Sequence, residues 1–312
     1  MKTPARLGLY GAGLAVAFGG AFGLAGVVVP ASAVDAWAKG TGMSTHSQGH
    51  TNEQQTAGQA LNGVSLSADG FALSPVKAPT ATGTEGELSF QVIGQGGPVT
   101  EFEREHDKDL HLIVVRSDGA QFRHVHPMLN EATGTWSLPW TWQEAGTYRV
   151  YTDFTPPGEG ASGITLTRTV QVAGDYAPVA SSPKRIDEVD GYTVTLDGGL
   201  AAGSTSELTL SVSRDGEPVT TLEPYLGAYG HLVALREGDL AYLHVHPEGK
   251  EPEPGSIGGA DIAFAAQAPT AGRYLLYLDF QVDGKVHTAE FVVDAGHAGG
   301  TQADDDSHSG GH

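Results

Sequence analysis

Two stretches of the chain decide its fold, HLIVVRSDGAQFRHVHP at residues 111–127 and HLVALREGDLAYLHVHP at residues 231–247. They align without a gap at an offset of 120 residues, and 7 of the 17 aligned positions are identical. The same offset aligns GELSFQVIGQGGPVTEFE with SELTLSVSRDGEPVTTLE on the N-terminal side. On the C-terminal side, AGTYRVYTDF at 145–154 matches AGRYLLYLDF at 271–280, at an offset of 126. The sequence therefore predicts two copies of one domain.

Apolar residues occupy every second position in short segments of both copies. Leu88, Phe90 and Val92 show the pattern in the first copy, and Leu208 and Leu210 show it in the second. This period is typical of half-buried strands, and about seven such strands at intervals of roughly 8–12 residues favour a β-sandwich. The 44 glycines and 17 prolines agree with many turns. We expect an all-β protein.

Domain boundaries follow from changes in composition. We place the first sandwich at residues 60–174 and the second at residues 186–295, joined by a linker at 175–185 that is rich in Gly, Pro and Ser. Residues 34–59 and 296–312 are poor in large apolar side chains, so they cannot bury enough surface to offset their chain entropy. Both are predicted to be disordered.

The N-terminus has the pattern of an export signal. Lys2 and Arg6 precede an uncharged run at residues 7–29, which is followed by Ala31 and Ala33 in an A-x-A triplet. The triplet is typical of a signal-peptide cleavage site, and the run is long enough to cross a bilayer as an apolar helix. We expect residues 1–33 to be a signal peptide cleaved near Ala33 or a single-pass anchor in the cytoplasmic membrane. Either alternative places the remaining chain outside the cytoplasm.

Charge and cysteine content exclude several classes of function. The chain has 37 acidic and 17 basic residues and a formal net charge of −20, which opposes binding to nucleic acid. It has no cysteine, which excludes disulfides, thiolate zinc sites and iron–sulfur clusters. An acidic surface raises the local concentration of cations, although solubility alone also explains it.

The repeated stretch carries three histidines in each copy. Residues two apart on a strand share a face, so an HxH motif presents two imidazoles on one side. A hairpin through residues 117–119 would bring the histidine that begins the preceding strand beside them. An aspartate on the later tyrosine-bearing strand could complete each site. The predicted ligands are His111, His124, His126 and Asp153 in the first copy, and His231, His244, His246 and Asp279 in the second.

Imidazole and carboxylate ligands suit Cu(II), Zn(II) or Ni(II), and the affinity order favours copper. The alternative is that these histidines are strand residues bonded to neighbouring carbonyls. That alternative is the better one for a single HxH motif, but the same register in two copies favours a metal site. His106 and His287 have no histidine at the matching position of the other copy, and we expect both to be solvated.

The export signal, the β-rich repeat, and the H-x12-HxHP and YxxYxDF patterns resemble bacterial envelope proteins associated with copper or heavy-metal handling. These are proteins with immunoglobulin-like domains, in the broad style of CopC and YtkA-like domains, and the resemblance covers residues 60–295. It implies two tandem immunoglobulin-like β-sandwiches after an N-terminal apolar helix. It also implies an extracytoplasmic binding protein that buffers, stores or delivers a divalent transition metal, Cu(II) or Zn(II), with a membrane transporter or another envelope protein as partner.

Two other classes of function remain open. The sequence has no GxSxG, HExxH or phosphate-binding glycine loop, so we expect no enzyme; a metalloenzyme built on three histidines with an open position is the minor alternative. A membrane-anchored adhesive or scaffolding protein without metal is the second alternative, because tandem sandwiches often present loops to partners. Trp136, Trp140 and Trp142 could cap the first site, but core packing is favoured.

Overall fold

The computed structural model describes residues 61–158, 160–243, 245–253 and 255–297. In these residues the regular elements are β-strands, so the all-β prediction is confirmed. No helix long and apolar enough to cross a membrane occurs among them. The expectations for the signal or anchor at 1–33, the linker at 34–59 and the tail beyond residue 297 lie outside the described residues.

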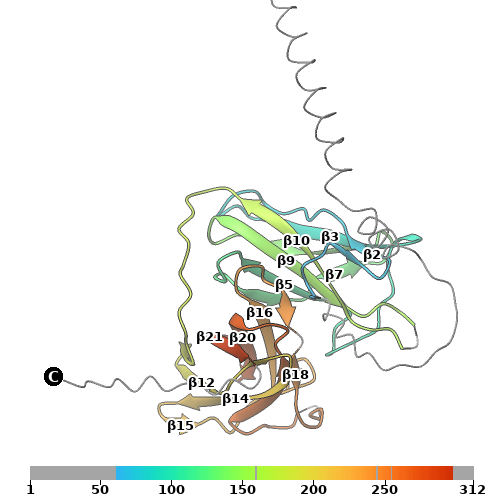
Figure 1. Cartoon of the computed structure of the whole chain (residues 1–312). Coiled ribbons are helices and arrows are strands. Elements are labelled where there is room, and N and C mark those ends of the chain that lie inside the picture. Colours follow the sequence, from blue (N-terminus) through green and yellow to red (C-terminus); the bar gives the residue numbers. More distant parts are fainter. Residues whose placement is uncertain (1–60, 159, 244, 254, 298–312) are drawn as a thin grey trace, which may run out of the picture. The chain divides into compact units, whose positions relative to one another are not determined.

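The first repeat forms two sheets (Figure 1). One contains, in spatial order, β1 (Ser67–Ala68), β2 (Phe71–Leu73), β3 (Gly86–Gly94), β8 (Thr135–Trp140) and β7 (Met128–Asn130), with β4 (Gly97–Pro98) on β3. The other contains β10 (Ile164–Val172), β9 (Gly146–Phe154), β5 (His111–Arg116) and β6 (Arg123–Val125).

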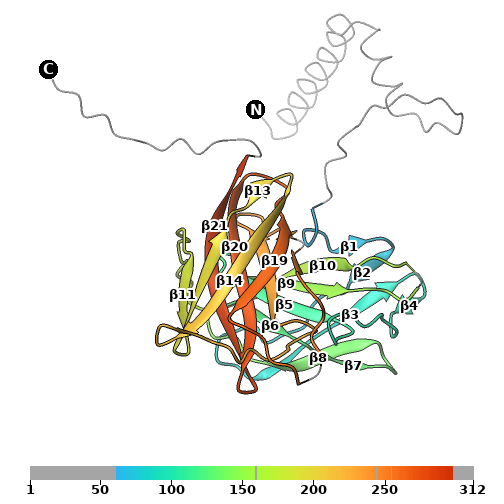
Figure 2. The same ribbon diagram turned by 90° about the horizontal axis from the view of Figure 1, so that it is seen from below.

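The second repeat also forms two sheets, whose long strands are seen best in Figure 2. One contains β11 (Ile186–Val189), β12 (Tyr192–Gly198), β14 (Thr205–Arg214), β19 (Asp261–Gln267) and β18 (Val245–Pro247), with β15 (Glu217–Pro218) on β14. The other contains β13 (Ala201–Ala202), β21 (Lys285–His297), β20 (Gly272–Val282), β16 (Gly230–Arg236) and β17 (Tyr242–Leu243). Strand β21 ends at His297, where the sequence placed the end of the domain at residue 295.

Both repeats have the strand order of an immunoglobulin-like sandwich. In the first, β2-β3-β8-β7 and β10-β9-β5-β6 follow the order A-B-E-D and G-F-C-C′. Each repeat also has the tyrosine corner of that fold, a tyrosine at the start of strand F bonded to the backbone just upstream. The Tyr148 hydroxyl donates to the Glu144 carbonyl at 2.8 Å, and the Tyr274 hydroxyl donates to the Thr270 carbonyl at 2.8 Å.

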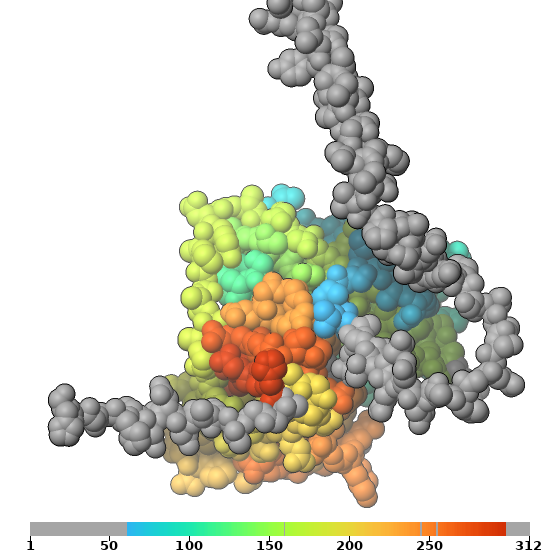
Figure 3. All heavy atoms as spheres, in the orientation of Figure 1, coloured from blue at the N-terminus to red at the C-terminus, as the bar shows by residue number. Residues whose placement is uncertain are grey.

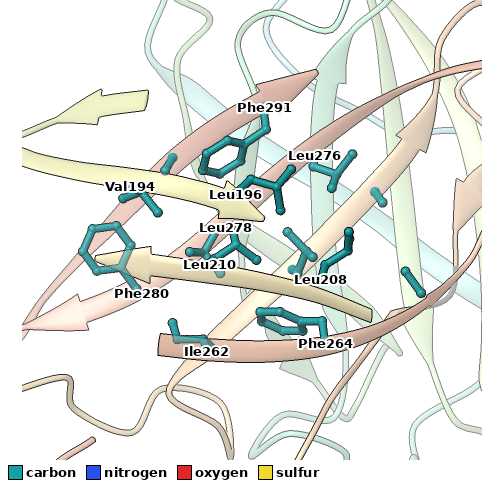
Figure 4. Packing of buried hydrophobic residues seen from close by; sticks show 14 of the residues in the cluster. Val194, Leu196, Leu208, Leu210, Ile262, Phe264, Leu276, Leu278, Phe280 and Phe291 are labelled. Carbon is teal, nitrogen blue, oxygen red and sulfur yellow. The ribbon is translucent and has the colours of Figure 1, made fainter. Parts of the chain in front are cut away.

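Each sandwich has its own apolar core. In the second repeat, Leu208 and Leu210 of β14 meet Leu276 and Leu278 of β20 between the two sheets (Figure 4). In the first, the three tryptophans are all buried in the core, so core packing is what the structure shows for them. Alternate residues of each strand face this interior, as the period of two predicts.

A third apolar cluster contains residues of both repeats. Figure 3 shows the atoms of the two repeats in direct contact. Ile113 and Val115 of β5 pack there with Val233 and Leu235 of β16, while the residues between them face the two cores. Strand β5 is therefore buried on both faces, and all six of its residues are buried. Period-two counting places His111 on the same face as Ile113, and His231 on the same face as Val233. Both histidines consequently face the junction between the repeats.

Two reciprocal hydrogen bonds fix this junction. The Tyr277 hydroxyl donates to the Gly119 carbonyl at 2.6 Å, and the Tyr151 hydroxyl donates to the Leu240 carbonyl at 2.7 Å. Gly119 has a φ of 88°, and a Cβ there would lie 2.5 Å from a side-chain carbon of Leu275. The positive φ of this turn favours glycine, and a larger residue would also have to displace the Leu275 side chain of the second repeat.

Candidate metal centre

Three imidazoles of the first repeat converge at the junction. His111 begins β5, His124 lies in β6, and His126 follows β6 directly. Pairing of Leu112 with Val125 and of Ile113 with His124 brings the ends of the two strands together, so the predicted hairpin is present. Nδ1 of His111 lies 3.0 Å from Nε2 of His124 and 3.2 Å from Nε2 of His126. One nitrogen from each ring falls within 4.8 Å of the others.

The hydrogen bonds around this group assign which nitrogens carry protons. His124 Nδ1 donates to Oδ2 of Asp279 at 2.8 Å, which leaves a lone pair on Nε2. His111 Nε2 donates to the Glu105 carbonyl at 3.3 Å, which leaves a lone pair on Nδ1. Two lone pairs therefore face each other at 3.0 Å. They cannot form a hydrogen bond without an added proton, whereas a metal ion would accept both.

Added protons are disfavoured by the surroundings of these rings. Burial, and then the proximity of His124, lowers the pKa of His111 to about 3 and that of His126 to about 3. Burial also lowers the pKa of His231 well below its usual value. These three imidazoles are therefore neutral at physiological pH, which is the form that binds metals.

Asp279 reaches the centre from the second repeat. Its side chain is buried, it lies opposite His231 in the pairing of β20 with β16, and its Oδ1 accepts a hydrogen bond from Thr288 at 2.6 Å. Its other oxygen accepts from His124 across the junction. A carboxylate that holds the far nitrogen of a histidine is the arrangement that orients metal-binding imidazoles and raises their basicity.

His231 lies beside the three histidines rather than within their group. Its ring stacks on that of His111 with centroids 5.5 Å apart, and its centroid is 4.7 Å from that of His124. Its Nδ1 is buried and has no hydrogen-bond partner among the described residues. The sequence predicted His231 as a ligand of a separate second site, but the structure places it against the histidines of the first repeat.

Of the second predicted set, the structure describes His231, His246 and Asp279, and among the described residues these three do not form a group like that of the first repeat. His244 lies outside the described residues, and His246 is exposed. Asp153 accepts a hydrogen bond from Thr165 at 2.7 Å, and Asp279 bonds to His124 instead of completing a site in its own repeat. His231 and Asp279 of the second repeat thus lie at the same junction as the three histidines of the first.

Of the two histidines expected to be solvated, His106 is exposed as predicted and His287 is not. His106 is exposed, but its ring centroid is 5.6 Å from that of His231 and 6.1 Å from that of His111. It occupies a turn with a φ of 47°, matched by Leu226 with a φ of 55° in the second repeat. His287, expected to be solvated, is buried, and its Nδ1 lies 2.8 Å from a carboxylate oxygen of Asp190. Only three-dimensional proximity reveals the position of His106, because its sequence context is an acidic loop.

A cavity of about 710 Å³ lies next to the centre and is lined by both repeats. His111 and His231 form part of its wall. Its charged lining is mainly acidic, with Glu103, Glu105, Asp107, Asp109, Asp153, Glu248, Glu251 and Asp261 against Arg104, Lys108 and Lys250. Such a lining attracts cations toward the histidines.

Fold and site together define a tandem immunoglobulin-like sandwich protein with a histidine cluster at the junction of its repeats. The chain belongs to the family described as Domain of unknown function (DUF8832), whose model matches it twice, at residues 67–174 and 187–297. No curated protein matches the chain.

Solved structures give distant likenesses. Domains 4 and 5 of the S-layer protein SbsC are 10% identical, with 73% of this chain and 96% of that chain covered and a TM-score of 0.22. A Salmonella alpha-2-macroglobulin mutant is 14% identical, with 76% and 15% covered and a TM-score of 0.24. A putative membrane anchored protein from Corynebacterium diphtheriae is 9% identical, with 73% and 59% covered and a TM-score of 0.21. At such scores the fold assignment rests on the strand order and the tyrosine corners described above.

Proposed function

We propose that this protein binds a divalent transition metal at the junction of its two repeats, through His111, His124 and His126. The observation that carries the proposal is the convergence of three imidazole nitrogens, two of which have their lone pairs directed at one another by hydrogen bonds on the far side of each ring.

The spacing of the nitrogens supports this proposal. Ligand nitrogens about 2.0–2.1 Å from a metal lie roughly 2.9–3.4 Å apart for coordination angles between octahedral and tetrahedral. The two nitrogen–nitrogen distances to His111 are 3.0 and 3.2 Å. Two of the three nitrogen pairs therefore already have the spacing that a bound ion requires, and the third pair lies within 4.8 Å.

The ligand set favours Cu(II), with Zn(II) as the second choice. Neutral imidazoles suit both ions, and the affinity order places copper first where it is available. The chain has no cysteine to offer a thiolate. A neutral imidazole ligand brings no charge to the ion, and the nearby carboxylate of Asp279 offsets part of the charge of the ion.

The proposed role is extracytoplasmic buffering, storage or delivery of the metal, with a membrane transporter or another envelope protein as recipient. The export signal at residues 1–33 supports the location, whether the segment is cleaved or retained as a single-pass anchor. The acidic cavity beside the histidines supports a route for a cation. We propose no catalytic activity, and a scaffold or adhesive protein without metal is the alternative.

The direct test is metal analysis of the purified full chain after dialysis against Cu(II) or Zn(II), with free glycine present to remove loosely held ions. We expect about one tightly bound equivalent per chain, because one group of three imidazoles meets in the part of the chain that the structure describes. His126→Gln should abolish tight binding. It is the best variant because His126 does not carry the bond to Asp279.

The matched control is His287→Gln, a buried histidine whose partner is Asp190. This variant should still bind about one equivalent of metal per chain. Fewer than about 0.2 equivalents in the unmodified chain would reject the metal centre and favour the scaffold alternative. About two equivalents, of which His126→Gln removes one, would instead support separate sites in the two repeats.

A further inference from the structure

His231 of the second repeat lies at the junction, and the proposed three-histidine centre gives it no role. Its Nδ1 is buried without a hydrogen-bond partner among the described residues. An unsatisfied buried nitrogen costs free energy and is uncommon in a well-packed protein. This nitrogen belongs to a ring that lines the cavity and lies against His111 and His124.

The second repeat already contacts the proposed centre at a neighbouring position. Asp279 is paired with His231 across β20 and β16, and it accepts the hydrogen bond of His124. The backbone pairing that places Asp279 against a ligand histidine therefore also places His231 beside the same ligand. Both residues reach the first repeat from adjacent strands of one sheet.

We propose that His231 is a fourth ligand of this metal, so that the ion is bound by both repeats and clamps them together. This inference rests on the proposed metal centre. Four imidazoles would complete a four-coordinate shell of the kind that Zn(II) and Cu(II) accept. The His231 ring lies outside the group of nitrogens within 4.8 Å, so it must shift toward the ion when the ion binds.

The clamp couples metal binding to docking of the repeats. The junction is already held by the apolar cluster and by the two tyrosine hydroxyls, so docking does not require the ion. A ligand that contacts both repeats nevertheless stabilises the docked arrangement over the undocked one. Loss of metal, for example to a recipient protein, would loosen the junction on the side of the cavity.

The first experiment counts nitrogen ligands in the full chain loaded with one equivalent of Cu(II), by nitrogen hyperfine structure in electron paramagnetic resonance. Four nitrogens are expected in the unmodified chain and three in His231→Gln. Isothermal titration should show that His231→Gln still binds about one equivalent but at least about tenfold more weakly, a loss that even the outer partner of a ligand can produce. His287→Gln should keep four nitrogens and the original affinity.

The second experiment follows amide exchange with and without Zn(II). Bound metal should slow exchange in β5, β6 and β16 of the unmodified chain. In His231→Gln the protection of β16 should shrink while that of β5 and β6 persists. Equal protection of β16 in both proteins would contradict the clamp.

The outcomes separate the two proposals. A three-nitrogen signal from the unmodified chain overturns the role of His231 even if the variant fails to fold, and leaves the three-histidine centre intact. Unchanged affinity and nitrogen count in His231→Gln do the same. Absence of tight binding in the unmodified chain overturns the metal centre itself.

Discussion

At the scale of single residues, two buried carboxylates hold other side chains in place, one at the junction and one within the first repeat. Asp279 fixes the ring of His124 so that Nε2 faces His111. Asp118 binds the buried guanidinium of Arg116 with both oxygens, at 2.8 and 2.9 Å, and also accepts from the backbone amide of Val179 at 2.8 Å. The Asp279 carboxylate orients a histidine of the candidate site, and the Asp118 carboxylate stabilises the fold.

Replacing Asp279 with asparagine should weaken metal binding by about 10–100-fold, the usual cost of losing the partner of a ligand histidine. An amide is uncharged, and its NH2 group can donate to Nδ1, which would put the proton of His124 on the metal-binding nitrogen. Competition titration against a chelator would measure the loss. Asp153→Asn is the matched control, since Asp153 is the aligned residue of the first repeat; an equal loss in both variants would contradict the assigned role.

Replacing Asp118 with asparagine should lower the free energy of unfolding by about 1.5–3 kcal/mol, because it weakens two charge-assisted hydrogen bonds to a buried guanidinium that keeps its ion pair with Glu144. Arg116 and Asp118 have side chains that are 1% and 8% exposed. The aligned arginine, Arg236, bonds to Asp239, whose side chain is 42% exposed. Asp239→Asn should therefore cost less than about 1 kcal/mol in the same urea titration.

The Asp118 pair also predicts an effect of pH. Burial alone would raise the pKa of Asp118, but hydrogen bonds from Arg116, Val179 and Ala120 outweigh burial and hold that pKa below its usual value. The stabilisation is therefore complete above the unfolded pKa of about 3.9 and is lost as the pH falls below it. Asp118→Asn should show a smaller loss of stability below that pH than the unmodified chain; an identical loss would contradict the assignment.

At the scale of elements, strand β5 and the hairpin that follows it carry both the junction and the site. Alternate side chains of β5 point to opposite faces, one set into the core of the first repeat and the other into the junction. His111 belongs to the second set, so it points toward the second repeat. The turn after β5 then receives the Tyr277 hydroxyl from β20, and Phe122 stacks on the Tyr277 ring with centroids 3.9 Å apart.

Tyr277→Phe should lower the free energy of unfolding by about 1–3 kcal/mol, because it leaves the buried Gly119 carbonyl without its donor while keeping the stacked ring. Chemical denaturation would measure the change. Tyr176→Phe alters a tyrosine that is 45% exposed and should change stability by less than about 0.5 kcal/mol. Equal effects of the two substitutions would show that the hydroxyl of Tyr277 does not hold the junction.

At the scale of the whole molecule, the two repeats act as one unit because each supplies part of the junction. Metal should therefore raise the melting temperature of the full chain, since a ligand that binds only the folded state at 100 times its dissociation constant adds about 2.7 kcal/mol. Calorimetry with and without a chelator would measure the shift. The shift should disappear in His126→Gln and persist in His287→Gln; a shift of the same size in both would locate the metal elsewhere.

Much of the fold and part of the site could be predicted from particular residues. The alternation at Leu88, Phe90 and Val92 predicts a strand, and Gly-x-Tyr at Tyr148 agrees with the tyrosine corner that forms there. The spacing of His111 from His124 predicts the hairpin that brings them together. The positions of His106 and His287 could not be predicted, because neither lies in the repeated motif that identified the other histidines.

The sequence by itself determined the duplication, the strands and the set of histidines that share a strand face, because these depend on local periodicity and on the offset between the copies. Tertiary structure alone decided which surface covers that face. The alternation of side chains along a strand puts His111 on the same face as Ile113, and His231 on the same face as Val233. A strand such as HLIVVR, however, has apolar residues on both faces, so its sequence does not say which face packs in the core. Docking of the two sheets brought Asp279 and His231 to the histidines of the first repeat, and long-range packing of this kind leaves no periodic signal in a sequence.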